Sequence, residues 1–205
     1  MNQMLSRKRR LEIVLQKLRH LESRSSKLEQ YSTPATIAAD VLWEAFNAGD
    51  IVGRMIADLG CGNGVFAIGA KLMGAAEAVG VDVDPAAVGL ARENAASLSL
   101  EIDFRELDVR EFTGQFDTVI QNPPFGAQTK HADRAFVEKA IELAPRAYSL
   151  HNEGTEEFIA KLASSLGARS VPVKSYKLEI PYAFEFHRKA VESVPVVLLR
   201  FDRDR

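Results

Sequence analysis

The chain has 205 residues, of which 46% are hydrophobic and 26% charged, the balance of an ordinary globular protein. Collagen-like, mucin-like and largely disordered chains are therefore excluded, and the length favours one domain. A single cysteine, Cys61, and four histidines exclude a disulfide framework and a zinc knuckle. We find no apolar stretch long enough for a signal peptide or a membrane span, so we expect a soluble cytoplasmic protein with no membrane partner.

Charge is unevenly distributed along the chain. Residues 1–30 carry eight Lys/Arg against three Glu, a net charge of +5, whereas residues 31–205 have a net charge of −7. Apolar residues recur at helical spacing in the basic segment, which predicts an amphipathic helix. Its charged side chains either form an ordinary solvent-exposed face of the helix or bind nucleic-acid phosphates. We expect one domain, 1–205, with 1–48 as a basic helical extension.

From about residue 54 onward, apolar runs of strand length alternate with helical patterns. Strands are predicted at 55–59, 78–82, 102–107, 118–121 and 148–150, and helices at 65–73, 85–98, 134–143 and from Thr155 to just before Gly167. This alternation indicates βαβ units and a parallel sheet, an α/β fold. Between 171 and 201 two strand-like runs have no helix between them, which predicts an antiparallel hairpin at the edge of the sheet.

A glycine-rich loop, Asp58-Leu59-Gly60-Cys61-Gly62-Asn63-Gly64, lies where the first of these strands ends and a helix begins. Glycines at alternate positions let the backbone turn tightly and approach a ligand, and such sheets bind ligands at the carboxyl ends of their strands. The spacing is not that of the dinucleotide fingerprint. Asp58 repels phosphate but suits a cation, and S-adenosylmethionine carries an ammonium and a sulfonium without phosphate. Cys61 is predicted to be a small loop residue rather than a nucleophile.

Further carboxylates follow the next two strands. Asp82 ends the second strand about 20 residues after the loop, where an acidic side chain accepts ribose hydroxyls. Asp84, just before Pro85, is equally suited to cap the next helix. Asp108 either accepts an adenine amino group, with Val109 packed on the ring, or is an ordinary loop aspartate.

The segment Asn122-Pro123-Pro124-Phe125 follows the fourth strand at the same edge. Two prolines fix φ and remove two N–H donors, so the loop presents carbonyl oxygens. The Asn122 side-chain oxygen and the Pro123 carbonyl would hold both hydrogens of an exocyclic NH2 group, turning its lone pair toward a methyl donor. Phe125 is expected to stack on a flat substrate. A plain turn is the alternative, but the position after the fourth strand favours chemistry.

These motifs together resemble those of Rossmann-like S-adenosylmethionine-dependent methyltransferases that methylate planar amino groups. Segments 28–34, 122–126, 147–151 and 186–189 narrow the resemblance to the methyltransferase-like protein 5 family and its archaeal relatives. It covers about residues 5–201. Family members make N6-methyladenosine in small-subunit ribosomal RNA. The resemblance implies a seven-stranded Rossmann-like sheet, mostly parallel with a C-terminal antiparallel hairpin, and helices on both faces.

The resemblance also implies a role for each matching residue. The cofactor would be covered by Gln30, Tyr31 and Thr33; its methionine part would be bound by Asp58, Gly60 and Gly62, its ribose by Asp82, and its adenine by Asp108 and Val109. The target base would meet Asn122, Pro123, Pro124 and Phe125, with Asn122 also beside the cofactor. Ser32 departs from the family, because eukaryotic relatives tend to have proline there. The segment over the cofactor is therefore expected to be less stiff, but no chemical role is lost.

Three basic clusters are expected to contact RNA phosphates around one crevice, although each also suits an ordinary polar surface. They are Arg7, Lys8, Arg9 and Arg10, with Lys17 and Arg19; Lys130, His131 and Arg134; and His187, Arg188 and Lys189. The target base must leave its stack to reach the Asn122 loop, which favours single-stranded or looped RNA.

The resemblance also implies a partner, and the sequence leaves two competing functions open. Eukaryotic members of the family work with a small zinc-binding activator of the Trm112 type. The third predicted strand is usually at a sheet edge in this fold, so such a subunit is expected to add a strand there, at a surface that includes Phe104. The alternative functions are N5-methylation of a protein glutamine, against which the basic segment argues, and a non-catalytic RNA-binding module. No metal site is expected.

Overall fold

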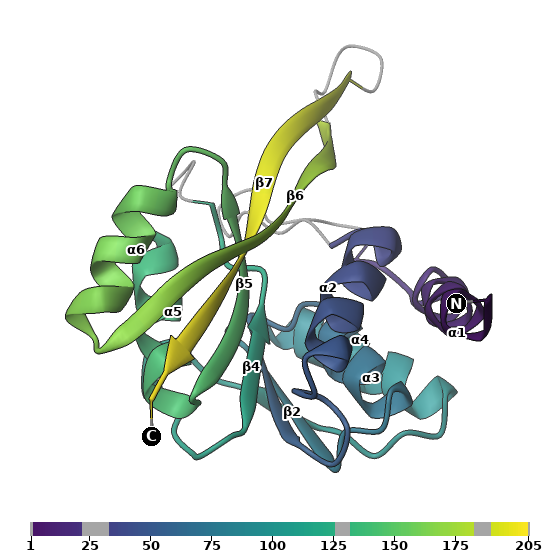
Figure 1. Ribbon diagram of the computed structural model, residues 1–205. Helices are drawn as coiled ribbons and strands as arrows, with labels where there is room; N and C mark the ends of the chain where they lie inside the picture. Colours follow the sequence, from purple (N-terminus) through teal and green to yellow (C-terminus); the bar gives the residue numbers. More distant parts are fainter. Residues whose placement is uncertain (1, 22–32, 126–131, 183–189, 205) are drawn as a thin grey trace.

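The computed structural model describes residues 2–21, 33–125, 132–182 and 190–204 (Figure 1). In these residues one sheet of seven strands has the order β3-β2-β1-β4-β5-β7-β6. The strands are β1 (Met55–Leu59), β2 (Glu77–Asp82), β3 (Asp103–Glu106), β4 (Thr118–Gln121), β5 (Arg146–Asn152), β6 (Ala168–Tyr182) and β7 (Ala190–Arg203). Strands β1 to β5 pair in parallel, and β7 pairs antiparallel with both β5 and β6. The expected α/β fold, edge hairpin and edge position of β3 are confirmed.

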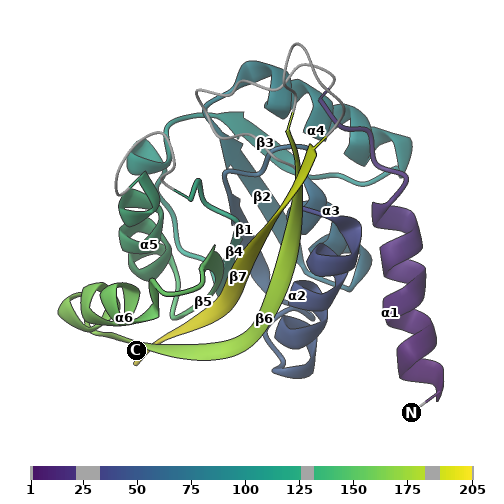
Figure 2. The ribbon, with the colours of Figure 1, turned by 90° about the horizontal axis from the view of Figure 1, so that it is seen from above.

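Helices cover both faces of the sheet (Figure 2). The helices are α1 (Asn2–Leu15), α2 (Ala35–Asn47), α3 (Val65–Leu72), α4 (Pro85–Ser97), α5 (Ala132–Leu143) and α6 (Glu156–Ser165), with a 3-10 turn at Val109–Glu111. One apolar core joins α1 to α4 with one face of the sheet, and a second joins α5 and α6 with the other. None of the described helices is both long and apolar enough to cross a membrane.

The structure differs from the sequence prediction at its N-terminal end. Helix α2 was not separately predicted, although Ile37, Ala38, Val41 and Leu42 bury it against α3. Its apolar residues surround most of the helix, so they lack the one-sided pattern of a surface helix. Helix α1 ends at Leu15, and the buried Leu18 lies in the turn that follows.

Phe104 does not lie on an exposed edge surface, which corrects the prediction. Its side chain is 2% exposed. Its ring fills the space over Gly64 and Gly80, where an added Cβ would come within 2.9 Å and 2.5 Å of ring atoms. Asp103, Arg105 and Glu106 are exposed on β3, so the free edge is formed by their backbone and not by an apolar side chain.

Candidate functional site

The carboxyl ends of the parallel strands bring the sequence motifs to one edge of the sheet. In the β1–β4 register Leu59 is opposite Gln121, so the glycine loop and Asn122 leave neighbouring strands side by side. On the other side of β1, Leu59 is opposite Val81, which places Asp82 next to the loop. The structure therefore groups Asp58, Asp82 and Asn122 as the sequence predicts.

The glycine loop is fixed to the end of β2. Gly60 and Gly62 have φ values of 67° and 53°, a left-handed conformation that favours glycine. The Gly62 N–H donates to Asp82 Oδ2 at 2.9 Å, and Asp82 Oδ1 accepts from the Asp84 N–H at 3.0 Å. Burial raises the pKa of Asp82, partly offset by these N–H groups. A Cβ at Gly62 would meet no atom within 4 Å, so the loop leaves open space for a ligand.

Asp58 presents a buried carboxylate oxygen to this edge. Its side chain is 1% exposed, and Oδ2 accepts from the Ala67 N–H at 3.0 Å. Oδ1 is buried and has no hydrogen-bond partner among the described residues. Burial raises the pKa of Asp58 to about 7, although the Ala67 N–H opposes this shift. An unpaired buried carboxylate is costly, so this oxygen suits an ammonium group from a ligand.

Two residues near the loop have local structural roles. The Asp84 side chain accepts from the Ala86 N–H at 2.9 Å and caps α4, as one of the two interpretations predicts. Cys61 is 3% exposed, and burial raises the pKa of its thiol, which therefore stays protonated.

Asp108 is already engaged by its own neighbour. Its carboxylate accepts from the Arg110 backbone N–H at 2.9 Å and from the Arg110 guanidinium at 2.5 Å. These bonds lower the pKa of Asp108 to about 2. Val109 is 9% exposed and packs into the core beneath α5, so contact with a ligand would involve only its edge.

Asn122 is oriented by Thr33. The Asn122 Nδ2 group donates to the Thr33 hydroxyl at 3.0 Å, and Thr33 is 5% exposed just before α2. Asn122 Oδ1 is buried without a hydrogen-bond partner among the described residues. Because Nδ2 is committed to Thr33, the oxygen is left as an acceptor. Sequence reasoning placed Thr33 beside the cofactor and did not anticipate its contact with Asn122.

Strand β5 holds the segment that follows β4, a role that sequence analysis missed. Ser149 accepts from Gln121 Nε2 at 3.0 Å and bonds His151 Nε2 at 2.7 Å. His151 Nδ1 lies 3.5 Å from Asp133 Oδ2, in the first turn of α5. Asn152 Nδ2 donates to the Phe125 carbonyl at 3.4 Å. The beginning and end of the β4–α5 connection are thus both attached to β5.

The chain leaving α1 is attached to the glycine loop, a second unanticipated contact. The Arg19 carbonyl accepts from Asn63 Nδ2 and from Asn94 Nδ2, both at 3.1 Å. The Arg19 N–H donates in turn to Asn94 Oδ1 at 3.0 Å. Asn63 and Asn94 are 5% and 2% exposed, so buried amides join the N-terminal extension to the predicted cofactor loop.

The basic residues do not form one group. Lys8 pairs with the buried Asp40, which also lies 2.5 Å from Lys174 Nζ and accepts from the Tyr176 hydroxyl at 3.0 Å. Burial lowers the pKa of Lys8. Arg19 pairs with Glu93 at 2.6 Å and Arg134 with Glu138 at 2.8 Å. These cations are therefore partly neutralised within the protein.

Arg7 and Arg10 lie away from the loop edge, contrary to the expectation that all clusters surround one crevice. Both line a hollow with Leu72 and Met73, at the end of α3. Helix α3 begins beside Gly64 and has eight residues, so these arginines lie about 12 Å along its axis from the glycine loop. Seven predicted site residues lie outside the described residues: Gln30, Tyr31, Lys130, His131, His187, Arg188 and Lys189.

We compared the chain with known protein families, proteins and solved structures. Residues 34–166 match the model of the methyltransferase small domain family. The chain belongs to this family. An uncharacterized protein of Methanocaldococcus jannaschii is 38% identical over 96% of this chain and 94% of its own length. The rRNA N(6)-adenosine-methyltransferase METTL5 of Danio rerio is 37% identical over 93% of this chain and 96% of its own length. The expected family is therefore confirmed.

Two further matches bear on fold and substrate. The crystal structure of PH1948 from Pyrococcus horikoshii, proposed to be an RNA methyltransferase, has a TM-score of 0.89 and 42% identity, covering 96% of this chain and 98% of that one. A protein of M. jannaschii proposed to be a protein N5-glutamine methyltransferase is 35% identical, but covers only 51% of this chain and 54% of its own length.

Proposed function

We propose that the chain is an S-adenosylmethionine-dependent methyltransferase that methylates N6 of an adenosine in small-subunit ribosomal RNA. The observation that carries the proposal is the buried, unpaired Oδ1 of Asn122, oriented by Thr33 at the carboxyl end of β4. An acceptor held at this place suits the amino group of a planar base. Relatives named for rRNA N6-adenosine methylation match the chain over nearly its full length.

S-adenosylmethionine supplies a methyl group on a sulfonium, which is an excellent leaving group. The residues present suit this cofactor, because the unpaired Asp58 Oδ1 is matched to an ammonium and Gly62 leaves open space. In the proposal Asp82 accepts the ribose hydroxyls, while Asp108 and Val109 meet the adenine. Gln30, Tyr31 and Thr33 cover the cofactor, and Gly60 and Gly62 let the backbone approach its methionine part.

The proposed chemistry depends on position and not on a strong base. The lone pair of an adenine amino group is delocalised into its ring, which makes the nitrogen a poor nucleophile. Hydrogen bonds to Asn122 Oδ1 and the Pro123 carbonyl favour a pyramidal nitrogen and strengthen as positive charge develops on it. Phe125 holds the ring by stacking. The proton leaves to water after transfer. Alignment of the nitrogen, methyl carbon and sulfur can account for ~7–11 kcal/mol of the activation barrier.

The proposed substrate is unstacked RNA in the cytoplasm, with the basic clusters as phosphate contacts. We also propose that a Trm112-like subunit pairs with the free edge of β3. That edge is short and flanked by charged side chains, and the Phe104 carbonyl accepts from Arg92 at 2.5 Å. An added strand would replace this side-chain contact with backbone hydrogen bonds.

Protein glutamine N5-methylation is the second candidate, because the glutamine amide is also a planar NH2 group. The partial match to a protein of that proposed activity favours it. Methylation of adenosine is preferred, since the relatives named for it match 93% and 95% of the chain, against 51% for the glutamine match.

The deciding experiment uses labelled S-adenosylmethionine and total RNA from a deletion strain, followed by digestion to nucleosides and mass spectrometry. It is run with and without a Trm112-like subunit. N6-methyladenosine is expected in small-subunit RNA. Asn122→Ala should retain cofactor binding and lose turnover by on the order of 10²-fold or more. Label on protein alone would favour the glutamine reaction, and near-normal turnover of Asn122→Ala would refute its role.

A further inference from the structure

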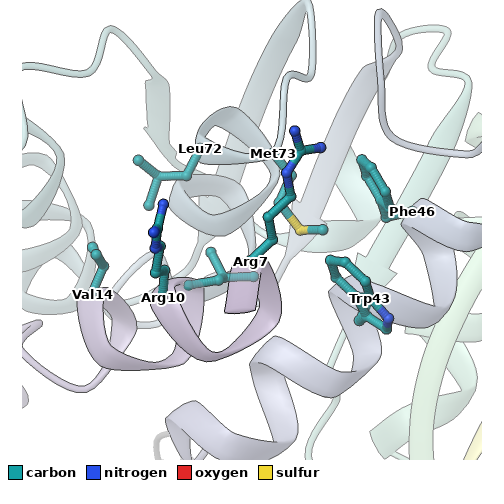
Figure 3. A pocket seen from close by; sticks show the side chains of 8 residues that line it. Arg7, Arg10, Val14, Trp43, Phe46, Leu72 and Met73 are labelled. Atoms are coloured by element: carbon teal, nitrogen blue, oxygen red, sulfur yellow. The ribbon is translucent and has the colours of Figure 1, made fainter. Parts of the chain in front are cut away.

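A hollow of about 360 Å³ lies between α1, α2 and the end of α3 (Figure 3). Its wall is apolar and aromatic, formed by Leu11, Val14, Trp43, Phe46, Leu72 and Met73. Trp43 and Phe46 are half-buried and stack on each other, with ring centroids 5.3 Å apart and an interplanar angle of 19°. The hollow therefore offers flat aromatic surface within the size range of small ligand sites.

Two arginines border this apolar wall. Arg7 and Arg10 are three residues apart on α1, are exposed, and project toward the end of α3 (Figure 3). Neither has an acidic partner among the described residues, whereas Lys8 and Arg19 on the same segment pair with Asp40 and Glu93. No acidic side chain is among the residues that line the hollow. Two cations without acidic partners thus accompany the aromatic surface.

The aromatic wall and the two arginines together indicate which kind of ligand the hollow can bind. Arginine fits phosphate oxygens, and an aromatic side chain stacks on any nucleobase. An apolar wall alone would suit a lipid tail. Two neighbouring arginines beside an aromatic ring instead suit a nucleic-acid strand, in which each flat base is flanked by negatively charged phosphates. The hollow lies about 12 Å along α3 from the glycine loop, so its occupant is not the nucleotide undergoing reaction.

We propose that this hollow binds a nucleotide of the RNA substrate outside the reaction site, with its base against Trp43 and the flanking phosphates on Arg7 and Arg10. This inference rests on the proposed RNA substrate. The N-terminal extension would then bind RNA in two ways. Its arginines would contact phosphates, and the hollow beside it would hold a base. The same extension continues through Arg19 to the glycine loop.

The test uses the full chain and its one tryptophan, Trp43, as a fluorescent probe. A 12-nucleotide single-stranded RNA should quench this fluorescence, whereas an abasic ribose-phosphate strand of equal length should bind more weakly without quenching. Arg7→Ala with Arg10→Ala should weaken RNA binding and reduce the slope of log K against log salt by about 1.4, as expected for two phosphate contacts. Trp43→Ala should weaken binding about tenfold, and Trp43→Phe should restore much of it.

The matched control is Lys161→Ala with Arg169→Ala, which removes the same charge from exposed positions outside the hollow and outside the three basic clusters. Equal effects of the two double variants would overturn the proposal in favour of diffuse charge attraction. Quenching by decanoate with displacement of RNA would overturn it in favour of an acyl anion. Wild-type methylation of RNA without quenching refutes only the hollow, and quenching without methylation refutes only the proposed reaction.

Discussion

Asp58 is a carboxyl group whose protonation should be linked to both folding and cofactor binding. Burial raises its pKa from 3.8 to about 7, so the folded protein holds this proton more tightly than the unfolded chain. The contribution of Asp58 to the free energy of unfolding therefore declines as pH rises from about 4 to 7 and is constant above that range. A bound ammonium reverses the preference, because it favours the ionised carboxylate.

We therefore expect affinity for S-adenosylmethionine to fall roughly tenfold per pH unit below pH 7, with close to one proton released on binding at pH 6. Calorimetry in two buffers of different ionisation enthalpy measures this release. Asp58→Asn should abolish the release and bind more weakly. The control is Asp84→Asn, which retains the helix cap. Proton uptake, or affinity independent of pH, would contradict the assignment.

Thr33 holds Nδ2 of Asn122 and leaves Oδ1 as the acceptor that we propose to meet the substrate. Thr33→Val is nearly isosteric but removes the acceptor for Asn122 Nδ2, so the amide loses its fixed orientation. Turnover at saturating cofactor should fall roughly tenfold, in line with loss of one partly buried hydrogen bond. Thr33→Ser keeps the hydroxyl and should remain near wild type. Equal turnover of the valine and serine variants would remove this role from Thr33.

Strand β5 is the element that joins the two ends of the β4–α5 connection, in which Asn122 lies. Ser149 bonds both Gln121, next to Asn122, and His151, which faces Asp133 on α5. Gln121 and Ser149 are fully buried, and Gln121 Oε1 already lacks a hydrogen-bond partner. If the Ser149 hydroxyl were removed, water could therefore not replace its hydrogen bonds.

Ser149→Ala should lower the free energy of unfolding by about 1–3 kcal/mol, since it leaves a second buried group of Gln121 unpaired. Turnover should fall as well, because Gln121 immediately precedes Asn122. Denaturant unfolding followed by circular dichroism measures the stability. Ser165→Ala serves as the control, because its hydroxyl bonds only its own helix. A stability change no larger than that of the control would show that the network is dispensable.

The difference between predicted and observed features follows from the range of the interactions. The glycine loop, Asp82 and Asn122 could be predicted because they lie at the carboxyl ends of the first, second and fourth parallel strands, which meet at one edge of the sheet. The Thr33–Asn122 and Arg19–Asn63 bonds join segments 89 and 44 residues apart, and no local pattern indicates them. Strand β5 was predicted as 148–150 but runs from Arg146 to Asn152, because pairing with β7 extends it. Phe104 was predicted on an exposed surface but is buried. A four-residue edge strand is too short for its sequence pattern to show which of its two faces packs against the core.

At the scale of the whole molecule, the free edge of β3 is where a second subunit can continue the sheet. The Leu107 N–H donates to the Asp82 carbonyl, so residues 103, 105 and 107 bond β2 in this parallel pair. The backbone groups of Phe104 and Glu106 therefore point away from β2. Arg92 covers the Phe104 carbonyl, which leaves the N–H groups of Phe104 and Glu106 as the donors for an added strand.

Glu106→Pro removes one of these two outward donors, the one next to the uncovered Glu106 carbonyl, without touching the β2–β3 hydrogen bonds, a change that edge strands tolerate. We expect it to abolish co-purification with a Trm112-like subunit while the isolated chain keeps its fold and its cofactor affinity. Glu106→Ala is the matched control, since it removes the same charged side chain but retains the backbone N–H, and it should still bind. If the proline variant retained the subunit, strand addition at β3 would be refuted. If both variants lost it, the contact would depend on the Glu106 side chain and not on backbone pairing.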